Sequence, residues 1–191
     1  MVSLLYKMEV KMEHTKLYHK KSPMPREKFS QLYEIMEYSF PPNERGSESL
    51  HYSELSRPEF RCLCFEPDNI PLAFLNYYEF PETETIFVEH FAVSAELRGR
   101  GTGSAIMEHL KRTTSPFLIV LEVEPPDGPT ERRRIDFYKR LGFHLNNGEY
   151  FQPEFYGKSP AIPLKLMTTR ELSERDFSEL ARFIHKRVYK K

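Results

Sequence analysis

The sequence lacks an excess of charge of either sign, and it lacks any long apolar run. Its 191 residues contain 28 Lys and Arg and 28 Asp and Glu, so the formal net charge at pH 7 is zero. A nucleic-acid-binding module usually carries a strong basic excess, so this balance argues against that class of protein. No apolar stretch approaches the roughly 18–20 residues that a membrane-spanning helix needs, and the first residues contain no apolar signal-peptide core.

Cysteine is also scarce, and internal repeats are absent. The two cysteines, Cys62 and Cys64, lie two positions apart, which excludes a disulfide framework and fits small residues of a core. The seven histidines show no paired spacing of the kind that binds a metal, so no metal site is expected. Without repeats, solenoids and propellers are excluded. These absences together predict a soluble cytoplasmic protein, and the 39% of hydrophobic residues argues against a disordered chain. The length predicts one domain with a single sizeable core.

Hydrophobic periodicity predicts an ordered series of strands and helices. Strands are expected near residues 13–19, 60–65, 72–80, 85–93, 117–123, 150–155 and 161–167. Helices are expected from Pro25 to Phe40, over 48–55, after Gly103, over 131–141 and from Ser173 onward. Short turn-rich links favour an antiparallel meander in the first half, whereas the continuous apolar run 117–123 is typical of a strand covered on both faces. The predicted fold class is therefore α/β, with a central mixed sheet that is antiparallel in its N-terminal half and parallel in the middle, flanked by helices.

The last segment, residues 169–191, is predicted to be an amphipathic helix. Ser173 and Asp176 have the spacing of a capping box. The apolar stripe consists of Phe177, Leu180, Ala181, Ile184 and Val188. Four of the last six residues are basic, which complements the negative end of the helix dipole. We interpret this helix as packed on the domain, with a homodimer contact as the alternative.

Three alternating glycines between a predicted strand and a predicted helix form the most informative segment. The strand ends with Phe91-Ala92-Val93, and the glycines occur in Arg98-Gly99-Arg100-Gly101-Thr102-Gly103-Ser104. Glycine permits positive φ, so successive backbone N–H groups can point into one concavity, and the helix N-terminus adds partial positive charge. The segment therefore suits a phosphate or pyrophosphate. It is not a dinucleotide fingerprint, because Ser104 stands at the third glycine position, and it is not a Walker loop, because no lysine follows.

The remaining pattern, Arg-x-x-Gly-x-Gly at Arg98, Gly101 and Gly103, resembles the acetyl-CoA pyrophosphate loop of the GNAT superfamily of N-acetyltransferases. A second segment, Ile135-Asp136-Phe137-Tyr138-Lys139-Arg140-Leu141-Gly142-Phe143, is similar to the F-Y-x-x-x-G-F helix of that family. The resemblance covers roughly residues 13–168, which we expect to form the GNAT domain, and leaves the C-terminal helix outside it. Within the family, the chain looks like a bacterial subgroup of uncharacterised members.

The resemblance implies an enzyme that moves the acetyl group of acetyl-CoA, as a co-substrate, directly to a primary amine. The implied acceptor is a small molecule or a peptide, with no nucleic acid or membrane as partner. The implied cofactor-binding residues, on the strand end and the glycine-rich loop, are Phe91, Ala92, Val93, Arg98, Gly99, Arg100, Gly101, Thr102, Gly103 and Ser104. Tyr138 matches the motif tyrosine, which implies that it is the general acid for the departing CoA thiolate.

The general base has two main candidates, Glu122 and Glu89, because both carboxylates interrupt otherwise apolar strands. Some relatives that act on protein N-termini place their base at the strand position of Glu122, and others use the strand of Glu89. Glu122 is slightly favoured, and a water relay is compatible with either. His90 and Glu124 are weaker candidates, since each points to the opposite face from its neighbouring glutamate or lies near a strand end.

One family position departs from the usual pattern. Seven residues before the motif tyrosine, relatives often carry an asparagine that contacts the pantetheine arm, whereas this chain has Glu131 followed by Arg132-Arg133-Arg134. We interpret the arginine run as a solvated face, with contact to the CoA phosphates as the alternative. Candidates for acceptor recognition, in the loop Pro41–Gly46 and the late strands, are Asn43, Glu44, Arg45, Tyr150, Gln152 and Tyr156.

Two other functions remain as alternatives from the residues alone. The first is a CoA-binding sensor or interaction module that has kept the loop and lost transfer. The second is a nucleic-acid-associated factor that uses Arg132–Arg134 and the basic C-terminus. The intact Tyr138 and the two strand glutamates, Glu122 and Glu89, favour the enzyme over both.

Overall fold

The computed structural model describes residues 12–42, 45–153 and 161–191. The chain forms two compact units, which we call the N-terminal unit (residues up to Asn76 and His90–Thr114) and the C-terminal unit (Tyr77–Glu89 and Ser115–Lys191). The strands are β1 (Thr15–Tyr18), β2 (Phe60–Phe65), β3 (Ala73–Phe80), β4 (Thr85–Val93), β5 (Leu118–Val123), β6 (His144–Leu145), β7 (Tyr150–Gln152) and β8 (Ile162–Thr168). The helices are α1 (Arg26–Ser39), α2 (Glu48–Glu54), α3 (Thr102–Thr113), α4 (Pro129–Arg140) and α5 (Glu174–Arg187).

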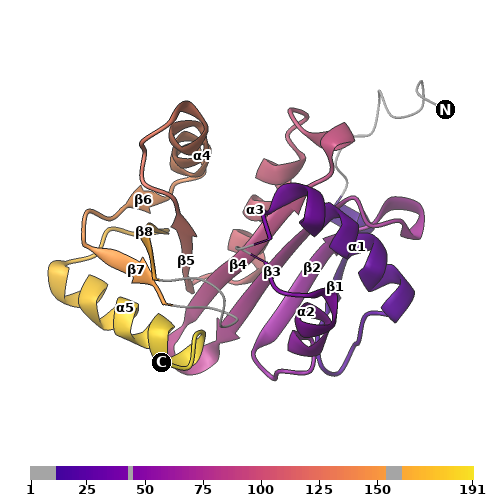
Figure 1. Cartoon of the computed structure of the whole chain (residues 1–191), viewed down its shortest axis with the longest axis horizontal. Helices are drawn as coiled ribbons and strands as arrows, with labels where there is room; N and C mark the ends of the chain where they lie inside the picture. The colour runs from indigo at the N-terminus through magenta and orange to yellow at the C-terminus, as the bar shows by residue number, and fades with distance from the viewer. Residues whose placement is uncertain (1–11, 43–44, 154–160) are drawn as a thin grey trace. The chain divides into compact units, whose positions relative to one another are not determined.

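The strands form one mixed sheet in the order β1-β2-β3-β4-β5-β8-β6, and β7 pairs with β8 (Figure 1). The β1–β2 pair is antiparallel, the β4–β5 pair is parallel, and β8 runs antiparallel to β5. This arrangement confirms the predicted α/β class and the change from antiparallel to parallel pairing in the middle of the sheet. Strand β6 was not predicted from the sequence, because two residues carry no periodic pattern.

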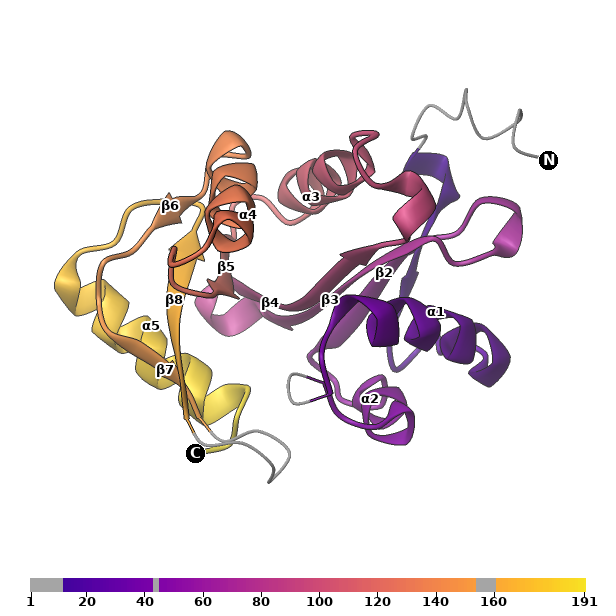
Figure 2. The ribbon, with the colours of Figure 1, turned by 45° about the horizontal axis from the view of Figure 1, so that its top comes forward.

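Helices cover both faces of the strands within the N-terminal unit. In Figure 2, α3 lies on one face, and α1 and α2 lie on the other. Helix α1 buries the predicted stripe of Phe29, Leu32, Tyr33 and Met36. It begins at Arg26, one residue after the proline that we had placed in its first turn, because that proline is the N-cap. The predicted apolar face of α1 is thus confirmed, and it fixes the helix against the sheet.

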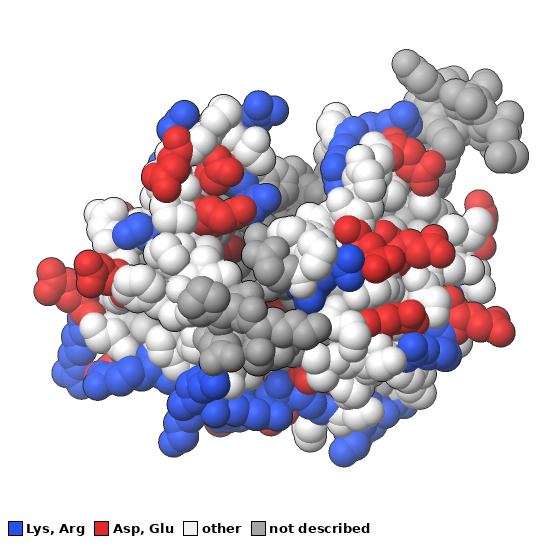
Figure 3. Space-filling view, viewed as in Figure 1, with Lys and Arg blue, Asp and Glu red and all other residues white. Residues whose placement is uncertain are grey.

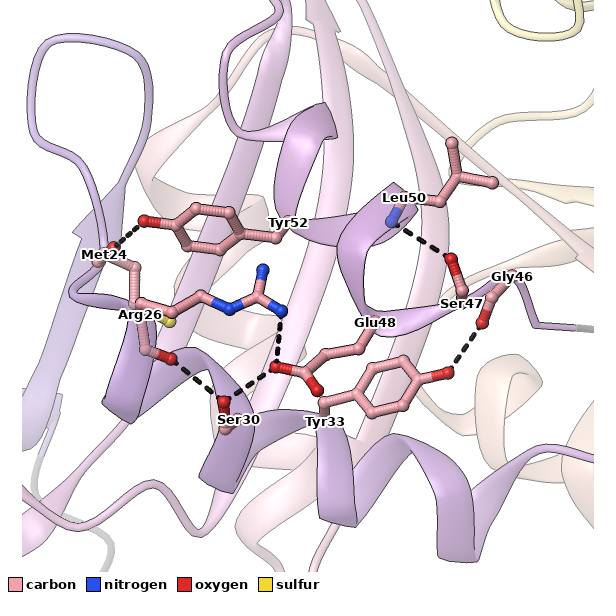
Figure 4. Close-up of polar contacts among 9 residues, drawn as sticks. All are labelled: Met24, Arg26, Ser30, Tyr33, Gly46, Ser47, Glu48, Leu50 and Tyr52. Carbon is pink, nitrogen blue, oxygen red and sulfur yellow. Dashed lines mark hydrogen bonds and ion pairs between the residues drawn. The ribbon is translucent and has the colours of Figure 1, made fainter.

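Polar contacts join α1 to α2 (Figure 4). The Arg26 guanidinium lies 3.0 Å from a carboxylate oxygen of Glu48, and the Ser30 hydroxyl donates to the same oxygen at 2.7 Å. The Tyr33 hydroxyl donates to the carbonyl of Gly46 at 2.7 Å. Ser47 caps α2 by accepting a hydrogen bond from a backbone N–H of its first turn. These bonds hold the start of α2, and the end of the loop that precedes it, against α1.

A buried ion pair lies between α1 and the residue that directly follows β2. The Lys28 ammonium lies 2.9 Å from an oxygen of Glu66, and the Tyr18 hydroxyl donates to both oxygens of that carboxylate at 3.0 and 2.9 Å. Cys62 and Cys64, on β2, are buried free thiols, and burial raises the pKa of both well above the ordinary value. The prediction that these cysteines are core residues is confirmed.

Helix α5 packs within the C-terminal unit. The N-cap Ser173 accepts a hydrogen bond from the Asp176 N–H at 3.1 Å, as the capping-box spacing predicts. Its buried residues include Phe177, Leu180 and Ile184. At its end, the Arg187 guanidinium lies 4.8 Å from the ring centre of Phe80 and bonds Glu82 at 2.5 Å. The predicted amphipathic helix is confirmed, and its apolar stripe covers the unit that contains β5, β7 and β8.

Helix α4 begins two residues earlier than predicted. We expected the helix to start at Glu131, and it starts at Pro129, because proline is compatible with the first turn of a helix. Gly142, with φ of 80°, follows its end in the left-handed conformation that glycine adopts at this position.

Charges of both signs are spread over the visible surface of the molecule, as Figure 3 shows. Among the helices of the described residues, none has both the length and the apolar character that crossing a bilayer requires.

Candidate functional site

The glycine-rich loop joins β4 to α3 in the N-terminal unit. Gly99 and Gly101 have φ of +73° and +81°, and a Cβ at either position would meet nothing within 4 Å. Glycine is therefore required here by the positive φ of the backbone, and not by lack of space for a side chain. Gly101 is the N-cap of α3, and no side chain in the described residues caps that end. The first N–H groups of α3, which include those of Thr102, Gly103 and Ser104, thus have no partner inside the helix and suit an anion.

The Arg98 side chain is engaged within the N-terminal unit. Its Nε donates to the carbonyl of Val93 at 3.1 Å, and Nη2 donates to the Ser39 hydroxyl at 3.2 Å. The guanidinium also lies 5.1 Å from the ring centre of Tyr38. Arg98 therefore connects the loop to the end of α1, and its contact with a phosphate stays a prediction. Arg100 is exposed on the same loop.

The Thr102 side chain is 1% exposed, and its hydroxyl has no hydrogen-bond partner in the parts of the chain that the structure describes.

Strand β4 alternates between two faces, as predicted. Glu89, Phe91 and Val93 are half-buried, whereas His90 and Ala92 are buried. The His90 ring packs edge-on against two aromatic rings of the N-terminal unit, with ring centres 4.8 Å from Phe40 and 5.1 Å from His51. This packing agrees with the low rank given to His90 as a base.

The parallel pairing of β4 with β5 covers only part of each strand. The described register runs from Thr85 opposite Leu118 to Val88 opposite Leu121. Strand β4 continues to Val93 and β5 continues to Val123. Both candidate bases, Glu89 and Glu122, therefore lie just beyond the residues that pair β4 with β5. The backbone N–H groups of Phe91 to Val93 also lie beyond this paired part of β4.

The Glu122 carboxylate is the centre of a hydrogen-bond network in the C-terminal unit. The Tyr150 hydroxyl donates to one oxygen at 2.5 Å, and the Tyr189 hydroxyl donates to the other at 2.7 Å. The Gln152 amide donates to that second oxygen at 3.4 Å and to the Tyr189 hydroxyl at 2.9 Å. Two phenols and an amide from β7 and from the end of the chain therefore converge on a single carboxylate of β5. We call this set the Glu122 network.

The two phenols of the Glu122 network stay protonated. Burial raises the pKa of the Tyr150 hydroxyl well above its usual range, and the neighbouring charge of Glu122 raises it further. The same two causes, in the same order, raise the pKa of the Tyr189 hydroxyl. Both groups therefore remain hydrogen-bond donors at neutral pH, which favours the ionised carboxylate.

The sequence predicted a functional role for only some residues of the Glu122 network. Glu122 was a candidate base, and Tyr150 and Gln152 were candidates for acceptor recognition, so the structure joins two sets that we had kept apart. Tyr189 was missed, since it follows the apolar stripe of the last helix and belongs to no motif. The signal available in the sequence was a tyrosine directly after the apolar stripe of a predicted amphipathic helix, because a tyrosine can pack its ring and still bond through its hydroxyl.

Glu89 has a different environment. The Tyr78 hydroxyl donates to one of its oxygens at 3.4 Å, a longer bond than those that the two tyrosines make to Glu122. Its side chain is half-buried on β4. Glu89 and Glu122 both belong to the C-terminal unit.

Tyr138 lies on α4 with its ring packed edge-on against Phe137 and Phe143, at 5.1 and 5.6 Å between ring centres. The residue is 8% exposed, and within the described residues its hydroxyl makes no hydrogen bond. Burial raises the pKa of Tyr138 to about 12; the charge of Arg134 opposes the rise and that of Glu124 adds to it. The hydroxyl is therefore protonated at neutral pH and suits a donor role.

The arginine run on α4 serves the local structure. Arg134 forms an ion pair with Glu124. Arg132 donates to the carbonyls of Pro126 and Asp127 at 2.8 and 3.2 Å, which holds the loop before the helix. These contacts support the interpretation of a solvated face, and they place Glu124 in an ion pair, in keeping with its low rank as a base.

The loop between α1 and α2 contains another predicted acceptor residue. Arg45 donates to the Tyr33 hydroxyl at 2.9 Å and to the Phe40 carbonyl at 3.1 Å, and it lies 3.1 Å from a carboxylate oxygen of Glu37. Its guanidinium is thus bound within the N-terminal unit. The other predicted acceptor residues, Asn43, Glu44 and Tyr156, lie outside the described residues.

Comparison with known proteins adds independent information. A family model described as the acetyltransferase (GNAT) family matches residues 28–143. A solved GNAT-family protein from Bacteroides thetaiotaomicron is 30% identical, with a TM-score of 0.80, and the match covers 92% of this chain and 97% of that one.

Two further proteins match over a short stretch or at low identity. The Bacillus subtilis protein YjbC, which is named among the acetyltransferases, is 34% identical over 58 residues, and the match spans only 30% of either chain. An aminoglycoside 6′-N-acetyltransferase, solved in complex with coenzyme A, is 13% identical with a TM-score of 0.56, and the match covers 84% of this chain and 99% of that one. At that identity the likeness concerns the fold alone.

Proposed function

The chain belongs to the GNAT acetyltransferase family, and on this premise we propose that it transfers the acetyl group of acetyl-CoA directly to a primary amine. The observation that carries the proposal is the glycine-rich loop of the family-matched region, which leads into a helix end without a side-chain cap. Such an end binds phosphate groups through backbone N–H groups. In our proposal Thr102, Gly103 and Ser104 hold the pyrophosphate of acetyl-CoA.

In this reaction the amine nitrogen attacks the thioester carbonyl carbon, the carbon–sulfur bond breaks, and an amide forms. Negative charge develops on the carbonyl oxygen, and we assign its stabilisation to backbone N–H groups between Phe91 and Val93. An amine with a pKa near ~10 is mostly protonated at neutral pH, so it must lose a proton first. Glu122 is our base, directly or through one water, and Glu89 is the alternative. Tyr138 donates to the departing thiolate.

The charge of the Glu122 network supports an amine acceptor. A half-buried carboxylate with protonated phenols around it offers a negative site to an ammonium group, and it accepts the proton that must leave.

Initial-velocity kinetics test the proposal of direct transfer. Free thiol release is measured while acetyl-CoA and an accepting amine are varied together. Direct transfer predicts intersecting double-reciprocal lines, because both substrates are bound before the chemistry. Parallel lines, together with an acetylated protein detected by intact mass, would contradict it. Tight acetyl-CoA binding without turnover of any amine would instead favour the CoA-binding module.

A further inference from the structure

Tyr189, at the end of the chain, contacts the proposed base, and no sequence motif assigns a role to it. We propose that Tyr189 is a positioning residue for acetyl transfer, which holds the Glu122 carboxylate ionised and oriented toward the acceptor amine. The inference rests on the proposed function for the role of Glu122 as base. The inference gives a role in the site to the segment after α5. This segment lies outside residues 28–143, which the family model matches.

The geometry around Tyr189 fixes its hydroxyl. The backbone N–H of Tyr189 donates to the carbonyl of Ile184 at 3.3 Å, so the residue continues the last turn of α5. Its ring packs edge-on against Phe87 of β4, with ring centres 6.3 Å apart, and the residue is 8% exposed. The Gln152 amide donates to the Tyr189 hydroxyl at 2.9 Å, while that hydroxyl donates to Glu122 at 2.7 Å. The phenol oxygen thus accepts from Gln152 and donates to Glu122, which orients the hydroxyl toward the carboxylate.

This arrangement has a chemical consequence for a base. A hydrogen bond donated to a carboxylate stabilises its charged form, so the group stays ionised to lower pH. Tyr150 and Tyr189 take one oxygen each, which also restricts rotation of the carboxylate. The base is therefore held ready before the amine arrives, at the cost of some basicity.

Other titratable groups face the same network. On α5, the His185 ring centre lies 5.3 Å from that of Tyr150 and 6.5 Å from that of Tyr189. On β8, Lys165 lies opposite Val123, next to Glu122 along β5, and its ammonium bonds the carbonyls of Asn147 and Gly148. On β4, the neighbour of β5 in the sheet, the titratable groups are Glu89 and His90. Tyr150 and Tyr189 each donate a hydrogen bond to Glu122, so removal of one phenol hydroxyl tests the inference directly.

The test is the Tyr189→Phe variant, which keeps the ring and removes the hydroxyl. We expect the acidic limb of the kcat/KM profile to move upward by about one pH unit, the lower end of what a hydrogen bond to a charged group is worth. Carboxyl-carbon NMR of the protein with labelled glutamate follows Glu122 directly, and its signal is assigned by its loss in Glu122→Gln. That signal is expected to titrate about one pH unit higher in Tyr189→Phe than in the wild type.

The matched control is Tyr18→Phe. The Tyr18 hydroxyl also donates to a buried carboxylate, that of Glu66, but it lies in the N-terminal unit. We expect this variant to leave both the acidic limb and the Glu122 signal unchanged. A thermal melt of both variants verifies that each is folded.

The two readouts separate the inference from the proposed function. An unchanged Glu122 titration in Tyr189→Phe would overturn the inference, whatever the enzyme acetylates. A shifted titration with an unmoved kinetic limb would remove Glu122 as the base, and with it the positioning role, while acetyl transfer itself would stand. If no amine is acetylated, the proposed function fails, and the NMR titration still decides whether Tyr189 sets the charge state of Glu122. Equal shifts in both readouts support the inference.

Discussion

The Tyr138→Phe variant removes the proposed acid and leaves the packing of α4 in place. The Tyr138 ring is held edge-on by Phe137 and Phe143, and phenylalanine keeps these contacts. Its hydroxyl makes no hydrogen bond among the described residues, so its removal leaves none of them with a lost partner. We therefore expect folding and acetyl-CoA binding to be preserved, while the chemical step is slowed.

The expected decrease in kcat follows from the raised pKa of the Tyr138 hydroxyl. Burial raises the pKa of Tyr138 to about 12. An ordinary thiol has a pKa of about 8.5, so complete proton transfer from Tyr138 to the thiolate would cost about 5 kcal/mol. The main contribution is therefore a hydrogen bond to the developing thiolate, worth roughly 1.5–3 kcal/mol for a charged acceptor. Its loss predicts a decrease in kcat of roughly ten- to a hundred-fold.

The assay is free thiol release between pH 6 and 10 at saturating acetyl-CoA. Because the pKa of Tyr138 is about 12, its hydroxyl stays protonated over this range and is lost as a donor only above it. The ratio of wild-type to variant rates should therefore be constant with pH. An unchanged kcat would refute the acid role. A ratio that falls steadily above pH 8 would refute the raised pKa.

Three further predictions concern the base, the loop and the stability of the N-terminal unit. Glu122→Gln should abolish the acidic limb of the pH–rate profile, whereas Glu89→Gln should keep it; the reverse result would exchange their roles. Gly101→Ala, at φ of +81°, should destabilise the loop by about 1–2 kcal/mol and raise the Kd for acetyl-CoA in a calorimetric titration, and an unchanged Kd would argue against this loop as the phosphate site. Lys28→Met leaves Glu66 buried without its cation, so denaturant unfolding should show that the free energy of unfolding falls by about 3–5 kcal/mol. We expect kcat/KM to be unchanged when it is measured at a temperature at which the variant is folded. A fall below about 1 kcal/mol would mean that the ion pair contributes little to stability.

Local patterns in the sequence predicted most of the fold. The spacing of three and four in α1 identified its buried face, and alternation with turn residues gave the observed bounds of β2 and β4. The parallel pairing of β4 with β5 was also expected from the continuous apolar run of β5. Strand β6 was missed because its two residues become a strand only by pairing with β8, which is a long-range contact. The division into two units within β3 and β4 has no local signal either.

The site was predictable where its residues form a short motif. Gly99 and Gly101, both with positive φ, lie within one short loop, so the sequence alone predicts that this loop suits a phosphate. The Glu122 network brings together side chains far apart in the chain, and Tyr189 lies 67 residues from Glu122. These long-range hydrogen bonds depend on how α5 and β7 pack near β5, and no local sequence pattern predicts that packing. The engagement of Arg98 with Val93 and Ser39 is likewise a product of the tertiary fold.

The most direct measurement is an amine-panel screen with acetyl-CoA, in which thiol release and the acetylated product are quantified in the same reaction. We predict that at least one amine raises thiol release above the rate without amine, with one acetamide formed per thiol, and that Tyr138→Phe slows both equally. Saturable acetyl-CoA binding, with thiol release that no amine increases, would contradict acetyl transfer as the function of this protein.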